Sequence, residues 1–200
     1  MNMVWLNGWG LSSRYVERIA RELYPDSLHS VVSPVSTWVE DLSWQGSGQV
    51  LVGYSLGAFL LLSRPEIGAR FRRVALLAPF HDFRAEAGRG GRVRKAQLAY
   101  LLRWLSRNRM EGLRDFWSRA ELENPENPNE LRTSDLEWGI QRLLKSSAHE
   151  SAGNGIQAYV GDQDTLLDAE ELKHRFKKFT VVSGAGHDLK PLARAAKLAE

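Results

Sequence analysis

Short apolar runs alternate with segments of helical periodicity along this chain. Between the first two runs, Val16, Ile19, Ala20 and Leu23 recur at the spacing of one buried helical face, and Ser13 is available as the N-cap. Apolar strands separated by amphipathic helices are typical of a mostly parallel sheet with helices on both faces, so the pattern predicts an α/β fold. The expected strands cover residues 3–6, 29–32, 49–52, 74–77, 156–160 and 179–182.

The alternation stops between residues 80 and 155. About 75 residues there carry helical patterns without a convincing strand, a length too great for an ordinary connection. Gly88, Gly90 and Gly91 predict a flexible start to this region, and two prolines among the asparagines of 124–129 indicate a break between its helices. We therefore expect one domain over residues 1–200, with a helical lid inserted at about 80–155.

The candidate chemistry begins where the third expected strand ends. Residues 53–57 read Gly-Tyr-Ser-Leu-Gly and precede an apolar helix expected at 58–62. A G-x-S-x-G sequence between a strand and a helix is a nucleophile elbow, whose tight turn exposes the serine Oγ and requires small residues such as Gly53 and Gly57. Ser55 is the predicted nucleophile. The alternative is a serine in a glycine-flanked turn of another α/β fold.

A serine nucleophile needs a general base, which should come last in the chain order Ser, acid, His. His187 lies just beyond the last expected strand in a Gly-Ala-Gly-His segment, where small residues let a loop carry the imidazole toward Ser55. His81 follows the strand at 74–77 and could line the pocket. The remaining histidines fit surface or packing positions: His29, His149 and His174.

The acid that orients the base should leave the sheet one strand before His187. Asp164 stands three residues beyond the glycine that ends that strand, so we choose it as the acid. Asp162 is nearer the turn and is expected only to hold the loop, and Asp82 is the reserve candidate. Because aspartate is common in turns, a purely structural role for Asp164 stays open.

An ester-cleaving serine also needs two backbone N–H donors for the oxyanion of the tetrahedral intermediate. Leu56, the residue after the nucleophile, is one expected donor. The second is expected from the loop after the first strand, where Asn7-Gly8-Trp9-Gly10 makes the Trp9 amide the natural choice. The glycines of this loop could also simply end a strand.

The composition of the chain excludes several classes of protein. Hydrophobic residues make up 43% of the chain and charged residues 26%, and no apolar run approaches the roughly 20 residues that span a bilayer. Residues 1–6 lack the basic start and long apolar run of a signal peptide. The absence of cysteine excludes disulfides, thiolate zinc sites and a cysteine nucleophile. We expect a cytoplasmic protein without a membrane span.

The net charge of +3 is unevenly distributed. Between Arg84 and Arg119, the basic block, ten bases stand against three acids, which gives +7 and leaves −4 for the rest. The block predicts an acidic partner or substrate, although a solvated arginine-rich helix surface explains it equally well. Nucleic acid is not expected, because only one block is basic and its aromatic residues fit helical core spacing: Tyr100, Trp104, Phe116 and Trp117.

With these residues placed, the chain resembles an α/β-hydrolase over most of its length outside the expected lid. More narrowly, the Asn-Gly-Trp-Gly-Leu segment at 7–11, the hydrophobic residue before Ser55 and the Gly-Ala-Gly-His ending are similar to the pimeloyl-acyl carrier protein methyl ester esterases of biotin synthesis. Asn7 stands where many relatives have histidine. The resemblance implies these roles: Ser55 as nucleophile, Asp164 and His187 as its partners, and Trp9 and Leu56 as oxyanion donors.

The same resemblance implies a serine carboxylesterase that cleaves the methyl ester of an acyl chain on acyl carrier protein, with neither metal nor organic cofactor. It also implies that the basic block, which falls in the lid, binds the acidic carrier. One alternative is a general small-molecule carboxylesterase or thioesterase. Another is a non-catalytic basic module that binds an acidic protein, but such a module has no need of serine, aspartate and histidine in this order.

Overall fold

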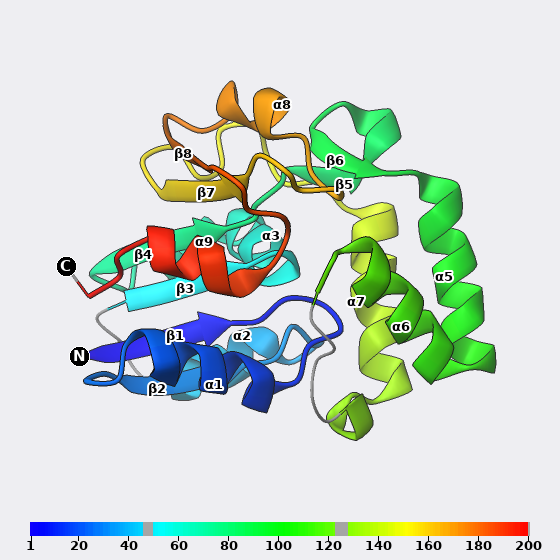
Figure 1. The fold of residues 1–200 in the computed structure, drawn as a ribbon, viewed down its shortest axis with the longest axis horizontal. Helices are drawn as coiled ribbons and strands as arrows, with labels where there is room; N and C mark the ends of the chain where they lie inside the picture. The colour runs from blue at the N-terminus through cyan, green and yellow to red at the C-terminus, as the bar shows by residue number, and fades with distance from the viewer. Residues whose placement is uncertain (46–49, 123–127, 200) are drawn as a thin grey trace.

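One six-stranded sheet organises the computed structural model, which describes residues 1–45, 50–122 and 128–199 (Figure 1). The strands pair in the order β2-β1-β3-β4-β7-β8, and every pairing is parallel. Trp5 of the central β1, for example, pairs with Val31 of β2 on one side and Val52 of β3 on the other. The strands are β1 (Asn2–Leu6), β2 (Leu28–Val32), β3 (Val50–Tyr54), β4 (Arg73–Leu77), β7 (Gln157–Gly161) and β8 (Lys178–Val182).

The α/β architecture predicted from the apolar runs is confirmed. Each expected strand is present and differs from its predicted range by one or two residues at an end. Gln49, the predicted start of the third strand, lies outside the described residues. The central strands are apolar at nearly every position because helices cover both faces of the sheet.

Helices α1 (Ser13–Leu23) and α9 (Leu189–Ala195) lie in front of the sheet in Figure 1, and α2 (Trp38–Trp44) and α3 (Leu56–Ser63) lie behind it. Two short helices, α4 (Pro65–Gly68) and α8 (Ala169–Lys173), lie in the connections before β4 and β8. The predicted N-cap of α1 was wrong by one residue. The hydroxyl of Ser12 accepts a hydrogen bond from the Tyr15 amide (3.2 Å), whereas Ser13 contacts the hydroxyl of Ser33.

In the described part of the region between β4 and β7, there are three α-helices and two short 3₁₀-helices. The α-helices are packed through buried leucine, isoleucine and phenylalanine side chains on their facing sides. Of the expected break at 124–129, residues 124–127 lie outside the described residues. The helices are η1 (Ala85–Ala87), α5 (Lys95–Arg107), α6 (Arg109–Arg119), η2 (Pro128–Glu130) and α7 (Thr133–Lys145).

The prediction of no strand in this region was wrong. Strands β5 (Asp82–Arg84) and β6 (Gly90–Val93) form a small parallel sheet of their own. Gly90 and Gly91, expected to make a flexible start, belong to β6. A Cβ on Gly91 would lie 2.1 Å from the Phe83 carbonyl oxygen, so a side chain is excluded. Two strands this short, one of them opening on glycines, carry little apolar periodicity.

All strands of the large sheet point the same way, so their carboxyl ends meet at one edge. That edge faces α5, α6 and α7 in Figure 1. The segments after β1, β3, β7 and β8, which hold the candidate site residues, all leave the sheet there. No helix among the described residues has both the length and the apolarity needed to cross a bilayer.

Candidate active site

Ser55 occupies a strained turn between β3 and α3. Its φ is 51° and its ψ is −114°, a conformation that costs a non-glycine residue about 1–3 kcal/mol. Close packing on both sides holds it there. A Cβ on Gly57 would lie 2.1 Å from the Leu6 carbonyl oxygen, and one on Gly53 would lie 2.9 Å from the Ala58 Cα. Both glycines therefore have the steric reason expected of a nucleophile elbow.

His187 reaches Ser55 from the loop after β8. The Ser55 Oγ lies 2.9 Å from Nε2 of the imidazole, and both residues are almost fully buried. The loop passes close to the end of β7, where a Cβ on Gly161 would lie 2.0 Å from the Ala185 carbonyl oxygen. The small residues before His187 thus allow the close approach that carries the imidazole to the serine.

Asp164 holds the other side of the imidazole. Its Oδ2 lies 2.8 Å from His187 Nδ1, and its Oδ1 accepts hydrogen bonds from the amides of Leu166 (2.9 Å) and Leu167 (3.0 Å). With Nδ1–H donating to the carboxylate, Nε2 is left as an acceptor for the Ser55 hydroxyl. The structure therefore brings the three predicted residues together in one buried chain of hydrogen bonds.

Tyr54 is a contact that the sequence analysis missed. Its hydroxyl donates a 2.6 Å hydrogen bond to the backbone carbonyl of His187, and the two rings are 5.7 Å apart. Burial, together with the nearby Asp188 and Asp164 carboxylates, raises the pKa of Tyr54 well above its usual value, so the phenol keeps its proton. Tyr54 fills a variable position of the elbow motif, which carries no signal for a partner 133 residues away.

The loop after β1 lies directly against the elbow. A Cβ on Gly8 would lie 2.8 Å from the Tyr54 ring and 3.4 Å from the Ser55 Cβ. Asn7 shapes this loop: its side chain accepts from the Gly8 amide (2.6 Å) and donates to the Leu11 carbonyl (2.9 Å), and it is fully buried. The loop that carries Trp9 and the elbow that carries Leu56 are therefore neighbours.

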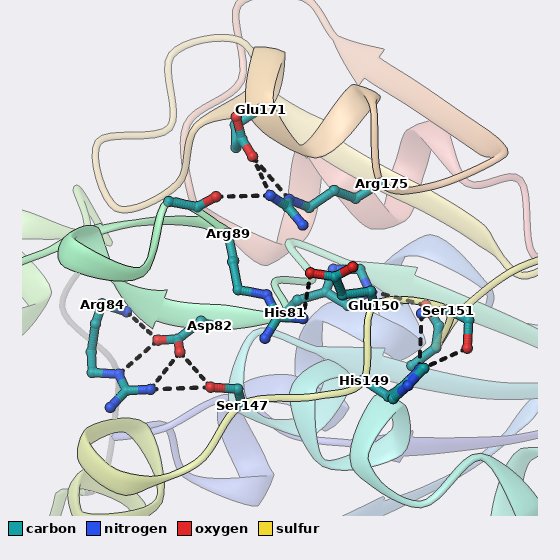
Figure 2. A network of polar contacts seen from close by, with 12 residues as sticks. His81, Asp82, Arg84, Arg89, Ser147, His149, Glu150, Ser151, Glu171 and Arg175 are labelled. Atoms are coloured by element: carbon teal, nitrogen blue, oxygen red, sulfur yellow. Dashed lines mark hydrogen bonds and ion pairs between the residues drawn. The ribbon is translucent and has the colours of Figure 1, made fainter.

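The secondary aspartates hold other parts of the structure. Asp162 accepts a 2.8 Å hydrogen bond from the Gly184 amide, so it holds the loop before His187 as expected. The prediction of Asp82 as a reserve candidate for the acid was wrong. The Asp82 carboxylate is bound by Arg84 and by the Ser147 hydroxyl, as Figure 2 shows, and does not enter the hydrogen-bond chain of Ser55. Burial alone would raise the pKa of Asp82, but these hydrogen bonds outweigh it and lower the pKa.

The suggestion that His81 could line the pocket was also wrong, because its contacts lie away from the candidate site. The ring is fully buried, its Nε2 lies 3.0 Å from the Ala152 carbonyl, and it packs against Phe176. Burial lowers its pKa. In Figure 2 it sits with Arg89 and Glu150, beside the ion pair of Arg84 and Asp82.

A cleft of about 530 Å³ opens beside the loop after β1. Gly8, Trp9 and Gly10 form one wall, the end of β2 and Thr37 form another, and Leu136 of α7 contributes a third. It is wide enough for part of a small-molecule substrate. A smaller apolar cavity of about 230 Å³ lies between α5, α6 and Leu166. Within the described ranges, no cluster of three or more His, Cys, Asp or Glu is arranged to hold a metal ion.

Comparison with known proteins agrees with this geometry. A model of the alpha/beta hydrolase family matches residues 3–200. No curated protein sequence matches the chain. An esterase from Exiguobacterium antarcticum has a similar structure, with a TM-score of 0.75 and 13% identity over 100% of this chain and 89% of that one.

Two further structures share the fold. A hydrolase from Oleispira antarctica aligns with a TM-score of 0.72 and 12% identity, over 98% of this chain and 86% of that one. The bottromycin epimerase BotH aligns with a TM-score of 0.69 and 15% identity, over 98% and 87%. At such identities the likeness concerns the fold alone, and the reaction has to be argued from the side chains.

Proposed function

Since the chain belongs to the alpha/beta hydrolase family and is a serine hydrolase, we propose that it is a carboxylesterase with Ser55 as its nucleophile. The observation that carries the proposal is the unbroken chain of hydrogen bonds from Ser55 through His187 to Asp164. A serine without such a base is a weak nucleophile at neutral pH.

In the proposed reaction, Ser55 Oγ attacks the ester carbonyl carbon while its proton passes to His187 Nε2. The negative oxygen of the tetrahedral intermediate is stabilised by the backbone amides of Trp9 and Leu56. The imidazolium, oriented by Asp164, then gives its proton to the departing alcohol and leaves an acyl ester on Ser55. Water attacks this ester with His187 as base, which releases the acid and returns the proton to Ser55.

For the substrate, we propose the methyl ester of a pimeloyl chain on acyl carrier protein, cleaved during biotin synthesis in the cytoplasm. The sequence similarity of the loop at 7–11 and of the His187 segment supports this. The helical region at about 80–155 would be the lid that meets the carrier. Among the described residues, four exposed cations of α5 and α6 have no ion-pair partner and could bind an acidic protein: Lys95, Arg103, Arg107 and Arg114.

A general small-molecule carboxylesterase or thioesterase is the second candidate, and the ion pairs of the basic block favour it. Arg84, Arg89, Arg92 and Arg119 each pair with a carboxylate of the same chain. Their charges are partly compensated within the fold, so less of the block is available to a partner.

The deciding experiment is hydrolysis of methyl pimeloyl-acyl carrier protein beside a short p-nitrophenyl ester, with wild type and Ser55→Ala. We expect serine-dependent cleavage that strongly favours the carrier-bound ester. Serine-dependent cleavage of the small ester alone would keep the carboxylesterase and reject the carrier substrate. Activity of Ser55→Ala equal to wild type on either ester would reject the nucleophile.

Charge reversal tests the proposed carrier contact separately. The pair Arg103→Glu and Arg107→Glu should lower kcat/KM for the carrier-bound ester by about tenfold, with little effect on the small ester, because rim charges mainly steer association. Added salt should reduce the same preference. The matched control is Arg70→Glu with Arg72→Glu, exposed cations before β4, at the opposite end of the sheet from the site. Equal losses in both pairs would contradict docking on α5.

A further inference from the structure

Both proposed oxyanion donors pack against a single glycine of helix α7. A Cβ on Gly139 would lie 2.4 Å from Trp9 Cδ1, 2.9 Å from Trp9 Nε1 and 3.1 Å from Leu56 Cδ2. The first two distances are shorter than a side-chain carbon can tolerate. Gly139 is therefore the point at which α7 comes close enough to touch the loop after β1 and the first residue of α3 together.

Two indole groups fasten the same loop to the helices. Trp9 Nε1 donates a 2.8 Å hydrogen bond to the Leu136 carbonyl, one turn before Gly139 on α7. From α6, Trp117 Nε1 donates a 2.9 Å hydrogen bond to the Gly10 carbonyl. Phe116 packs edge-on against the Trp9 ring, with centroids 4.7 Å apart, and Trp9 as a whole is only 4% exposed. The loop is thus fixed through the Trp9 side chain and the Gly10 backbone.

A glycine at position 139 needs a structural explanation, because glycine within a helix is destabilising relative to alanine. Gly112 of α6 provides the contrast. A Cβ there would meet only the ends of the Leu105 and Leu101 side chains, at 3.2 and 3.5 Å, so small movements of flexible side chains accommodate it. At Gly139 the neighbour is a rigid indole held by a hydrogen bond and a ring contact, and it cannot move without moving the loop.

We infer that Gly139 is a positioning residue for the oxyanion hole, so that helix α7 sets where the Trp9 and Leu56 amides lie. The inference rests on the proposed function, because it needs these two amides to be the donors. Displacing a catalytic group by about 1 Å can cost about 10²-fold in rate, and oxyanion donors act only at hydrogen-bond distance from the developing charge. A methyl group at position 139 would push directly on the side chains of both donor residues.

The test compares Gly139→Ala with Gly112→Ala on a p-nitrophenyl ester. For Gly139→Ala we expect kcat to fall about 10- to 100-fold, approaching the loss of one oxyanion donor, with KM changed less than about threefold. Gly112→Ala should stay within about twofold of wild type. Active-site titration corrects kcat for any inactive fraction, and thermal midpoints confirm that both variants are folded.

A second readout separates positioning from a general structural effect. A boronic acid forms a tetrahedral adduct with Ser55 whose oxygen occupies the oxyanion hole, so its affinity should fall in proportion to kcat in Gly139→Ala. If Gly139→Ala does not fold, Trp117→Phe removes the hydrogen bond to Gly10 without adding volume and should lower kcat about three- to tenfold.

Unchanged kcat and unchanged boronate affinity in a folded Gly139→Ala, or in Trp117→Phe where Gly139→Ala does not fold, would overturn the inference. So would an equal loss in Gly112→Ala. An inactive wild type would instead reject the proposed carboxylesterase, so the two failures are distinguishable.

Discussion

Two clusters in the described structure contain serine, histidine and aspartate, and their side chains form different hydrogen bonds. In one, His187 lies between Ser55 and Asp164 and contacts both. In the other, Asp82 binds Ser147 directly and pairs with Arg84, while His81 turns to a backbone carbonyl (Figure 2). The same residue types therefore make a candidate nucleophile in one place and a cross-link between β5 and the segment after α7 in the other.

The partners of the two carboxylates explain the difference. Backbone amides hold one oxygen of Asp164 and leave the other for the imidazole. Arg84 occupies both oxygens of Asp82, so that carboxylate has no free edge with which to orient a histidine. An imidazole between acid and hydroxyl can accept the serine proton, whereas an arginine that is always charged cannot.

The largest expected difference in kcat is between variants of Ser55 and variants of Ser147. Ser55→Ala should lower kcat by at least about 10⁴-fold, since no other group on the proposed pathway can form the acyl ester. Ser147→Ala should leave kcat within about twofold and lower stability by about 1 kcal/mol through the lost hydrogen bond to Asp82. Steady-state kinetics and thermal unfolding of both variants measure this. A large loss of kcat in Ser147→Ala would break the distinction between the clusters.

Substitution of Asp164 should mainly lower kcat, whereas substitution of Asp82 should mainly lower stability. Asp164→Asn should lower kcat by about 10³- to 10⁴-fold, because an amide no longer fixes the histidine tautomer or stabilises the imidazolium. Asp82→Asn should keep kcat and lower the free energy of unfolding by about 1–3 kcal/mol. Urea unfolding of the two variants gives the stabilities. Comparable kcat losses would mean that Asp82 also serves the reaction.

The stabilising effect of the ion pair between Asp82 and Arg84 should be lost at acidic pH. The folded-state pKa of Asp82 is lowered, so its stabilising contribution is present above the unfolded pKa of about 3.9 and is lost as pH falls through the folded value. The stability gap between wild type and Asp82→Asn should therefore narrow on going from pH 5 towards pH 2. A gap that stays constant over this range would show that the lost stability is not electrostatic.

The smallest expected effect concerns His81. Burial lowers its pKa, so the unfolded chain binds a proton below about pH 6.5 while the folded chain resists it, and stability falls as pH drops. His81→Gln should weaken the loss of stability between pH 7 and pH 5. His174→Gln, at an exposed position, is the control and should retain the wild-type slope. Identical slopes for wild type and His81→Gln would reject this account.

The strands of the large sheet and the chain order of the candidate site residues could be predicted from the sequence alone. The six apolar runs predicted the parallel strands because side-chain periodicity is a local property, readable within a few residues. The elbow motif can also be recognised within five residues, although the contact that requires glycine at position 57 is with the Leu6 carbonyl of another strand. The order of Ser55, Asp164 and His187 follows from the strands that they leave.

Contacts between segments distant in the chain could not be predicted, because they depend on how the whole fold packs. Tyr54 reaches the His187 carbonyl over 133 residues and Trp9 reaches Leu136 over 127, and no local pattern encodes either contact. The short strands β5 and β6 pair with each other, and β6 also bonds to the distant segment around Leu167. Whether an aspartate faces an arginine or an imidazole, as Asp82 and Asp164 do, depends on which side chains the packed fold brings beside it.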